Sequence, residues 1–176
     1  MKTRKLLLLV IMMTACSFTA NAQLFGGQRM SENYKSKLWV DAGFGTCTGD
    51  IGEGGGCEIA LRYTHMFSEN VGWDVLKIGA STATDYFTEM LDLQAKTGVR
   101  IISPVIFGRS TLFANGALGY GFYTDGEQSN FGWEAGAGLN ISPRFAVGVV
   151  YSSNMYSVHG YHSNNGLISL RVSIGL

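Results

Sequence analysis

The residues best suited to catalysis lie near the C-terminal end, in the segment HGYHSNNG at 159–166. A serine nucleophile needs a general base within hydrogen-bonding distance, and His162 stands directly before Ser163. Neighbouring residues in an extended chain point to opposite faces, so this pair is a poor proton relay unless His159 or another strand supplies the base. The two histidines have no third protein ligand nearby, as a zinc site would require. We therefore expect no catalytic residue, no metal site and no cofactor.

Two cysteines, Cys47 and Cys57, bracket the segment TGDIGEGGG and have the chemistry for either a disulfide or metal ligation. The third cysteine, Cys16, falls within an N-terminal export signal, so an even number remains in an exported chain, where disulfides persist. Neither a neighbouring histidine nor a second cysteine pair completes a metal site. We expect a structural disulfide. The intervening glycines lack the Lys-Ser/Thr of a phosphate-binding loop and predict a flexible turn.

The first 22 residues have the layout of a secretory signal peptide. A basic start precedes an apolar run over 6–15, and the small residues ANA stand before Gln23. The alternative is a lipoprotein signal with Cys16 acylated at the new N-terminus. Cleavage after residue 22 removes three of the 13 basic residues and leaves 10 against 13 acidic ones. A mildly acidic chain is not expected to bind nucleic acid.

The remainder of the chain consists of segments in which apolar and polar residues alternate, as in half-buried strands. Short connections (SENV, SPVIFGRS and SPR) alternate with longer polar ones, among them SNMYSVHGYHSNN at 153–165. An up-and-down meander of eight strands closes into a barrel without exposed edges. After a short lead-in at 23–36, residues 37–176 form this single domain. The expected strands are 37–46, 57–67, 73–80, 90–102, 111–123, 131–141, 145–152 and 167–176.

The composition indicates which face of these strands meets water. Charged residues make up 15% of the chain, whereas soluble domains average about 25%, and 24 residues are glycine. Many glycines share a strand face with the charged residues, where a narrow barrel has little room for side chains. The opposite face is aliphatic in mid-strand and aromatic towards the strand ends, the pattern of membrane barrels. We expect a polar, side-chain-filled interior and a lipid-facing exterior, with a soluble ligand-carrying barrel as the rival fold.

The segment LDLQAKTGVRIISP at 91–104 displays this pattern most clearly, because its charges fall on one face. An isolated buried charge costs several kcal/mol, so we expect the inward charges to form a hydrogen-bonded ionic network instead of lining an open channel. The same alternation in the other strands adds further members. The predicted lumen network is Asp41, Glu58, Arg62, Lys77, Asp92, Lys96, Arg100, Glu134 and Arg171.

The longer loops carry acidic residues and no lysine or arginine. They are expected to form a solvated acidic rim. The alternative is divalent-cation bridging to lipopolysaccharide phosphates, or recognition of a basic partner. The acidic loop residues are Asp50, Glu53, Asp85, Glu89, Asp125 and Glu127.

Over residues 37–176 the chain resembles the small eight-stranded outer-membrane β-barrel proteins of the OmpA/OmpX-like superfamily. The signal ending ANAQ, the eight alternating segments and the final segment LISLRVSIGL carry this resemblance. An apolar-alternating last strand is similar to the signal read by the outer-membrane assembly machinery, although this chain ends in Leu176 where an aromatic residue is more usual. The resemblance implies an outer-membrane location, contact with lipid and lipopolysaccharide, a periplasmic N-terminus, short periplasmic turns and outward loops.

The function expected from this resemblance is structural or surface-interacting and non-enzymatic, with the outward loops carrying any binding to a surface partner. Two alternatives remain. Lipid A deacylases of similar shape carry a His-x-Ser-Asn motif in this region, where the present chain has His162, Ser163 and Asn164 without the intervening residue. A lipid A-modifying acyl hydrolase and a narrow solute channel are therefore kept as alternatives.

Overall fold

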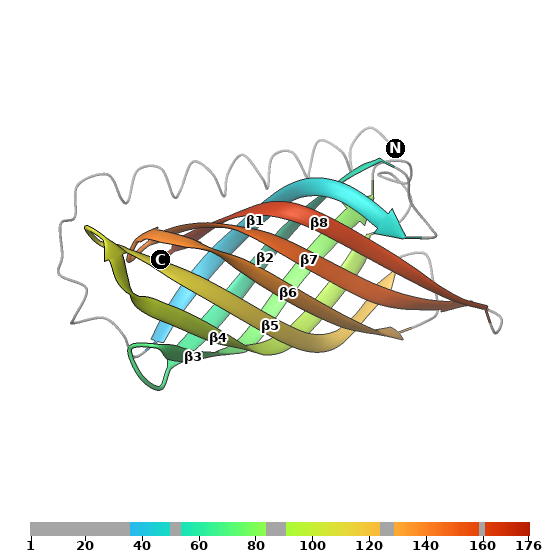
Figure 1. The fold of residues 1–176 in the computed structure, drawn as a ribbon. Coiled ribbons are helices and arrows are strands. Elements are labelled where there is room, and N and C mark those ends of the chain that lie inside the picture. The colour runs from blue at the N-terminus through green and yellow to red at the C-terminus, as the bar shows by residue number, and fades with distance from the viewer. Residues whose placement is uncertain (1–35, 50–53, 84–90, 124–128, 159–160) are drawn as a thin grey trace.

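The computed structural model describes residues 36–49, 54–83, 91–123, 129–158 and 161–176, which form a closed antiparallel barrel of eight strands (Figure 1). Each strand pairs with the next along the chain, and β1 pairs with β8 to close the barrel. The predicted eight-stranded up-and-down barrel is therefore confirmed. The strands are β1 (Ser36–Gly49), β2 (Gly55–Met66), β3 (Val71–Ala83), β4 (Asp92–Phe107), β5 (Ser110–Tyr123), β6 (Ser129–Ser142), β7 (Phe145–Val158) and β8 (Tyr161–Gly175).

Alternation along the strands separates two faces of opposite chemistry. On β2, for example, Glu58 and Arg62 are buried whereas Leu61 and Tyr63 are exposed. Successive side chains of a strand point to opposite sides, so the buried set faces the barrel axis. Within the described segments, no helix is long and apolar enough to cross a membrane.

Two hairpins are longer than expected from the sequence. β4 continues to Phe107, so most of SPVIFGRS is strand and only Gly108 and Arg109 form the turn. Gly108 has a positive φ of 57°, a conformation that glycine adopts without steric cost. The β7 and β8 ladder likewise runs out to Val158 and Tyr161, through most of the segment predicted as a loop. Pairing across a hairpin satisfies the backbone of both strands, so polar residues alone do not end a ladder.

An irregularity in β3 changes which of its residues face inward. Tyr63 of β2 is opposite Leu76, but the next residue, Thr64, is opposite Asp74. One extra residue therefore lies in β3 between these pairs, which is a β-bulge. A bulge reverses the alternation beyond it. As a result, Asp74 and Lys77 both lie on the inner side although they are three positions apart.

The predicted disulfide between Cys47 and Cys57 is wrong, since the two cysteines are not joined in the structure. In the β1 and β2 ladder, Cys57 is opposite Phe44, whose side chain is exposed, so Cys57 belongs to the outer face. The Cys47 sulfur lies beside Gly56, whose missing side chain would point inward, so Cys47 belongs to the inner face. The two cysteines therefore point to opposite faces, and side chains so arranged cannot be bridged without moving the backbone.

Candidate functional site

The interior of the barrel is filled with charged side chains. All nine residues predicted for the lumen network are buried, none with more than 8% of its surface exposed. Asp74, with 3% exposed, is a tenth member that the regular alternation missed because of the β3 bulge. Among the described residues the buried charges are thus balanced, with five acids and five bases. They are Asp41, Glu58, Asp74, Asp92 and Glu134 with Arg62, Lys77, Lys96, Arg100 and Arg171.

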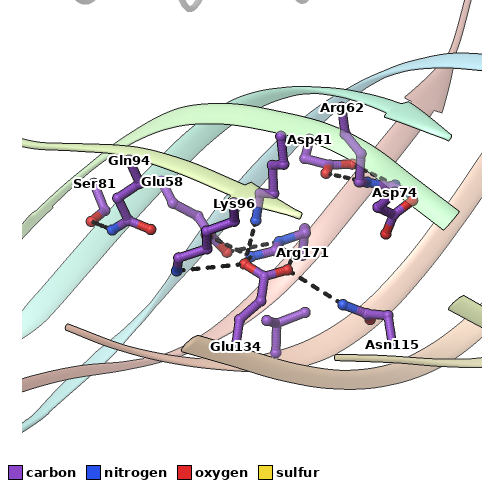
Figure 2. A network of polar contacts seen from close by, with 12 residues as sticks. Asp41, Glu58, Arg62, Asp74, Ser81, Gln94, Lys96, Asn115, Glu134 and Arg171 are labelled. Atoms are coloured by element: carbon purple, nitrogen blue, oxygen red, sulfur yellow. Dashed lines mark hydrogen bonds and ion pairs between the residues drawn. The ribbon is translucent and has the colours of Figure 1, made fainter. Parts of the chain in front are cut away.

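Arg171 is held between two carboxylates at the centre of the network (Figure 2). Its Nε and Nη2 donate to the two oxygens of Glu58 at 2.9 and 2.7 Å, and its Nη1 donates to Glu134 Oε1 at 2.9 Å. Ser169 donates a further hydrogen bond of 2.5 Å to Glu58. Bidentate arginine–carboxylate pairs are among the strongest hydrogen-bonded contacts in proteins, so this trio joins β2, β6 and β8 firmly across the lumen.

Two lysines complete the central cluster on the far side of Glu134. Lys77 Nζ lies 2.5 Å from Glu134 Oε2, and Lys96 Nζ lies 3.8 Å from the same oxygen. Lys96 Nζ has no hydrogen-bond partner within the described part of the chain. Beside it is a cavity of about 10 Å³, room for about one water molecule, lined also by Lys77, Ser81 and Gln94. The central cluster therefore carries one more base than acids and leaves little open space.

A second cluster, built around Arg62, has the opposite surplus. Arg62 donates to both oxygens of Asp41, at 2.8 and 3.0 Å, and to Asp74 at 3.3 Å. Thr64 donates to Asp74 at 2.5 Å. With two acids and one base, this cluster offsets the extra positive charge of the central one. The network is thus neutral as a whole and not pair by pair.

The remaining two buried charges, Asp92 and Arg100, are stabilised mainly by side-chain amides and by an aromatic ring. Gln94 donates to the carboxylate of Asp92 at 2.5 Å, and the amide of Asn154 also donates to it. Arg100 donates to Asn140 Oδ1 at 2.8 Å, and its guanidinium carbon lies 3.7 Å from the ring centre of Phe113. Hydrogen bonds from amides and the negative face of an aromatic ring both stabilise a charge that has left water.

Glycines on the inner face make room for these charges. A Cβ added at Gly43 would lie 2.6 Å from Glu58 Oε1, and one at Gly121 would lie 2.8 Å from Asp92 Oδ1. Both distances are shorter than real Cβ contacts, so any side chain at these positions displaces the carboxylate. The glycine-rich composition therefore has a packing reason in the lumen.

The outer face of the barrel has the composition of a protein core. Aliphatic side chains in mid-strand are about half exposed, including Leu118 at 56% and Leu170 at 58%. Aromatic side chains lie on the same face towards the strand ends, such as Phe67, which stacks on Trp73 with ring centres 6.4 Å apart. An apolar surface of this extent indicates an apolar environment.

The remaining predicted site residues belong to the last hairpin and to the acidic loops, and only some of them are among the described residues. His162 and Ser163 lie in the β7 and β8 ladder opposite Ser157 and Tyr156. His159 lies outside the described residues, as do all the acidic loop residues, Asp50, Glu53, Asp85, Glu89, Asp125 and Glu127.

One serine–histidine contact that the sequence did not predict is present at the opposite end of the barrel. Ser36 Oγ lies 3.0 Å from His65 Nδ1, at an exposed position. A catalytic pair also needs a third group to orient the base and donors to stabilise an oxyanion, and the contacts of His65 given by the structure are to Ser36 and to the ring of Phe67. We assign it no catalytic role. Across the described strands and turns, no group of three potential metal ligands is present.

Comparison with known proteins addresses the fold. No family model matches the sequence, and no curated protein matches it. Neisserial surface protein A (NspA) matches with a TM-score of 0.59 and 10% identity, over 79% of this chain and 96% of that chain. The outer membrane enzyme PagL matches with a TM-score of 0.61 and 15% identity, over 78% and 99%. At these identities the likeness concerns the fold alone: the chain has the fold of the small eight-stranded outer-membrane β-barrels.

Proposed function

We propose that the protein is an integral outer-membrane barrel with a structural or surface-interaction role and no enzymatic activity. The observation that carries this proposal is the inverted distribution of side chains, with ten charges buried along the axis and aliphatic and aromatic side chains exposed outside. Only helices and closed barrels satisfy every backbone polar group within lipid, and this chain is a closed barrel.

The proposed orientation follows from the resemblance to outer-membrane barrels. The end that holds Ser36, Leu176 and the short turns faces the periplasm, and the longer loops face outward and carry any binding. The apolar outer face of the strands, which includes Leu118 and Leu170, forms a lipid-facing band. This band contacts membrane lipid and lipopolysaccharide. During biogenesis the signal peptide at 1–22 is cleaved, and the assembly machinery reads the alternating residues of β8.

Cell fractionation tests the location. We expect the mature protein in the outer-membrane fraction, with a gel mobility that changes on heating, because a closed barrel stays folded in detergent until heated. A periplasmic protein of known location serves as the fractionation control. Recovery of this protein with the periplasmic control instead would support the soluble barrel and overturn the proposal.

Conductance measurements test the role of the filled lumen. We expect the protein, reconstituted in a planar bilayer, to give little or no steady current, because the ion pairs of Glu134 with Lys77 and Arg171 cross the lumen and the cavity beside Lys96 admits about one water molecule. An open porin in the same bilayer provides the positive control. Stable unitary currents from this protein would favour the solute-channel alternative.

A further inference from the structure

The hairpin that joins β4 and β5 projects beyond its neighbours. The β3 and β4 pairing ends at Val71 and Ile101, with Asn70 bonded to Ile102 just beyond, and the β5 and β6 pairing ends at Thr111. Residues 103–110 therefore pair only within the hairpin. Figure 1 shows it as the yellow hairpin that extends past the barrel at the end where the C-terminus lies.

The projecting hairpin carries three consecutive apolar side chains that are exposed. Val105, Ile106 and Phe107 are 55%, 45% and 82% exposed. The β4 and β5 pairing shifts register between Ile102 and Val105 and again between Val105 and Phe107, so this part of β4 is irregular and leaves three consecutive apolar side chains exposed. Arg109 at the turn is the charged residue of this segment and is exposed. An exposed apolar strand segment in water is an association hazard, so this segment is expected to be covered.

Two observations identify lipid as the cover. The apolar side chains of the hairpin follow those of the lipid-facing band along the same strand, since Val99 and Ile101 on β4 are 51% and 58% exposed. Pro104 removes a backbone donor from the unpaired edge of β4, which disfavours the addition of a peptide strand there.

We propose that residues 103–110 form a lipid anchor, which inserts Val105, Ile106 and Phe107 into the boundary between acyl chains and headgroups of the adjacent leaflet. Arg109 at the tip lies among the phosphates, where a basic residue beside an apolar anchor is favourable. This inference rests on the proposed membrane location and adds to it a one-sided extension of the lipid contact, over β4 and β5. In the proposed orientation the leaflet is the periplasmic one.

Spin labelling of the full mature chain tests the anchor. A nitroxide is attached to Phe107→Cys in a Cys47→Ser/Cys57→Ser background and reconstituted in phosphatidylethanolamine and phosphatidylglycerol vesicles. We expect oxygen, which partitions into lipid, to relax this label several-fold more effectively than a water-soluble nickel complex does. Ile106→Cys provides a second label at the neighbouring position of the hairpin, with the same expected result.

Two further labels in the same background distinguish failure of the anchor from failure of the membrane location. Leu118→Cys reports the lipid-facing band, and Arg144→Cys reports the exposed β6 and β7 turn at the same end of the barrel. The anchor is refuted if the Phe107 and Ile106 labels are as accessible to nickel as the Arg144 label, or shielded from both reagents as under a protein cover. If the Leu118 label is itself accessible to nickel, the membrane location fails and the anchor fails with it.

Discussion

Glu134→Gln is expected to lower the free energy of unfolding by about 3–5 kcal/mol, the cost of breaking a buried ion pair by removing one partner. The substitution keeps the shape of the side chain but removes the negative charge that Lys77 and Arg171 contact at 2.5 and 2.9 Å. Lys96 loses its carboxylate neighbour as well. The central cluster is then left with three bases and one acid in a site from which water is largely excluded.

Urea unfolding of the purified protein in detergent or lipid, followed by tryptophan fluorescence, measures this loss. Glu69→Gln is the matched control, because Glu69 is an exposed glutamate on the turn between β2 and β3 and its replacement should change stability by less than about 0.5 kcal/mol. The double variant Glu134→Gln/Lys77→Met should recover part of the loss, since it removes one uncompensated lysine. If the Glu134 and Glu69 variants are equally stable, Glu134 does not hold the network together.

The eight strands and the two faces were predictable because the charges make the faces chemically distinct. On β4, Asp92, Lys96 and Arg100 recur at every fourth position, so one strand of regular alternation places all three inside. This regularity holds wherever the ladder has no bulge. The inward-facing residues of these strands could therefore be predicted without any knowledge of three-dimensional contacts.

The parts that were missed depend on backbone geometry that alternation does not encode. Nothing in the sequence around Asp74 marks the extra residue of β3, so regular spacing from Lys77 left Asp74 out of the predicted lumen network. Cysteine count and compartment suggested a bridge, yet the ladder places Cys47 and Cys57 on opposite faces. The ion-pair partners were equally unpredictable, because they connect strands such as β2 and β8 that lie far apart in sequence and meet only when the barrel closes.

Leu118→Arg is expected to cost about 2–4 kcal/mol of stability in lipid vesicles, because a cation in the middle of the lipid-facing band leaves water for hydrocarbon. Leu118 is 56% exposed on the outer face of β5, midway along the strand between Thr97 of β4 and Trp133 of β6. Both of these cross-strand neighbours are uncharged, so an arginine at position 118 has no carboxylate beside it on the outer face. The cost should appear as a lower urea midpoint, read by the gel mobility of folded and unfolded protein.

The same change nearer the end of the barrel provides the depth control. Phe67 is 66% exposed beside the β2 and β3 turn, and Phe67→Arg should cost about 0–1 kcal/mol, because the charge can reach the headgroups there. This gradient distinguishes the membrane barrel from its soluble rival. On a water-facing barrel both substitutions place an arginine on a wet surface, where the change is usually within about 0.5 kcal/mol. Equal, small effects at both positions would mean that the apolar face meets water, and the membrane location would have to be abandoned.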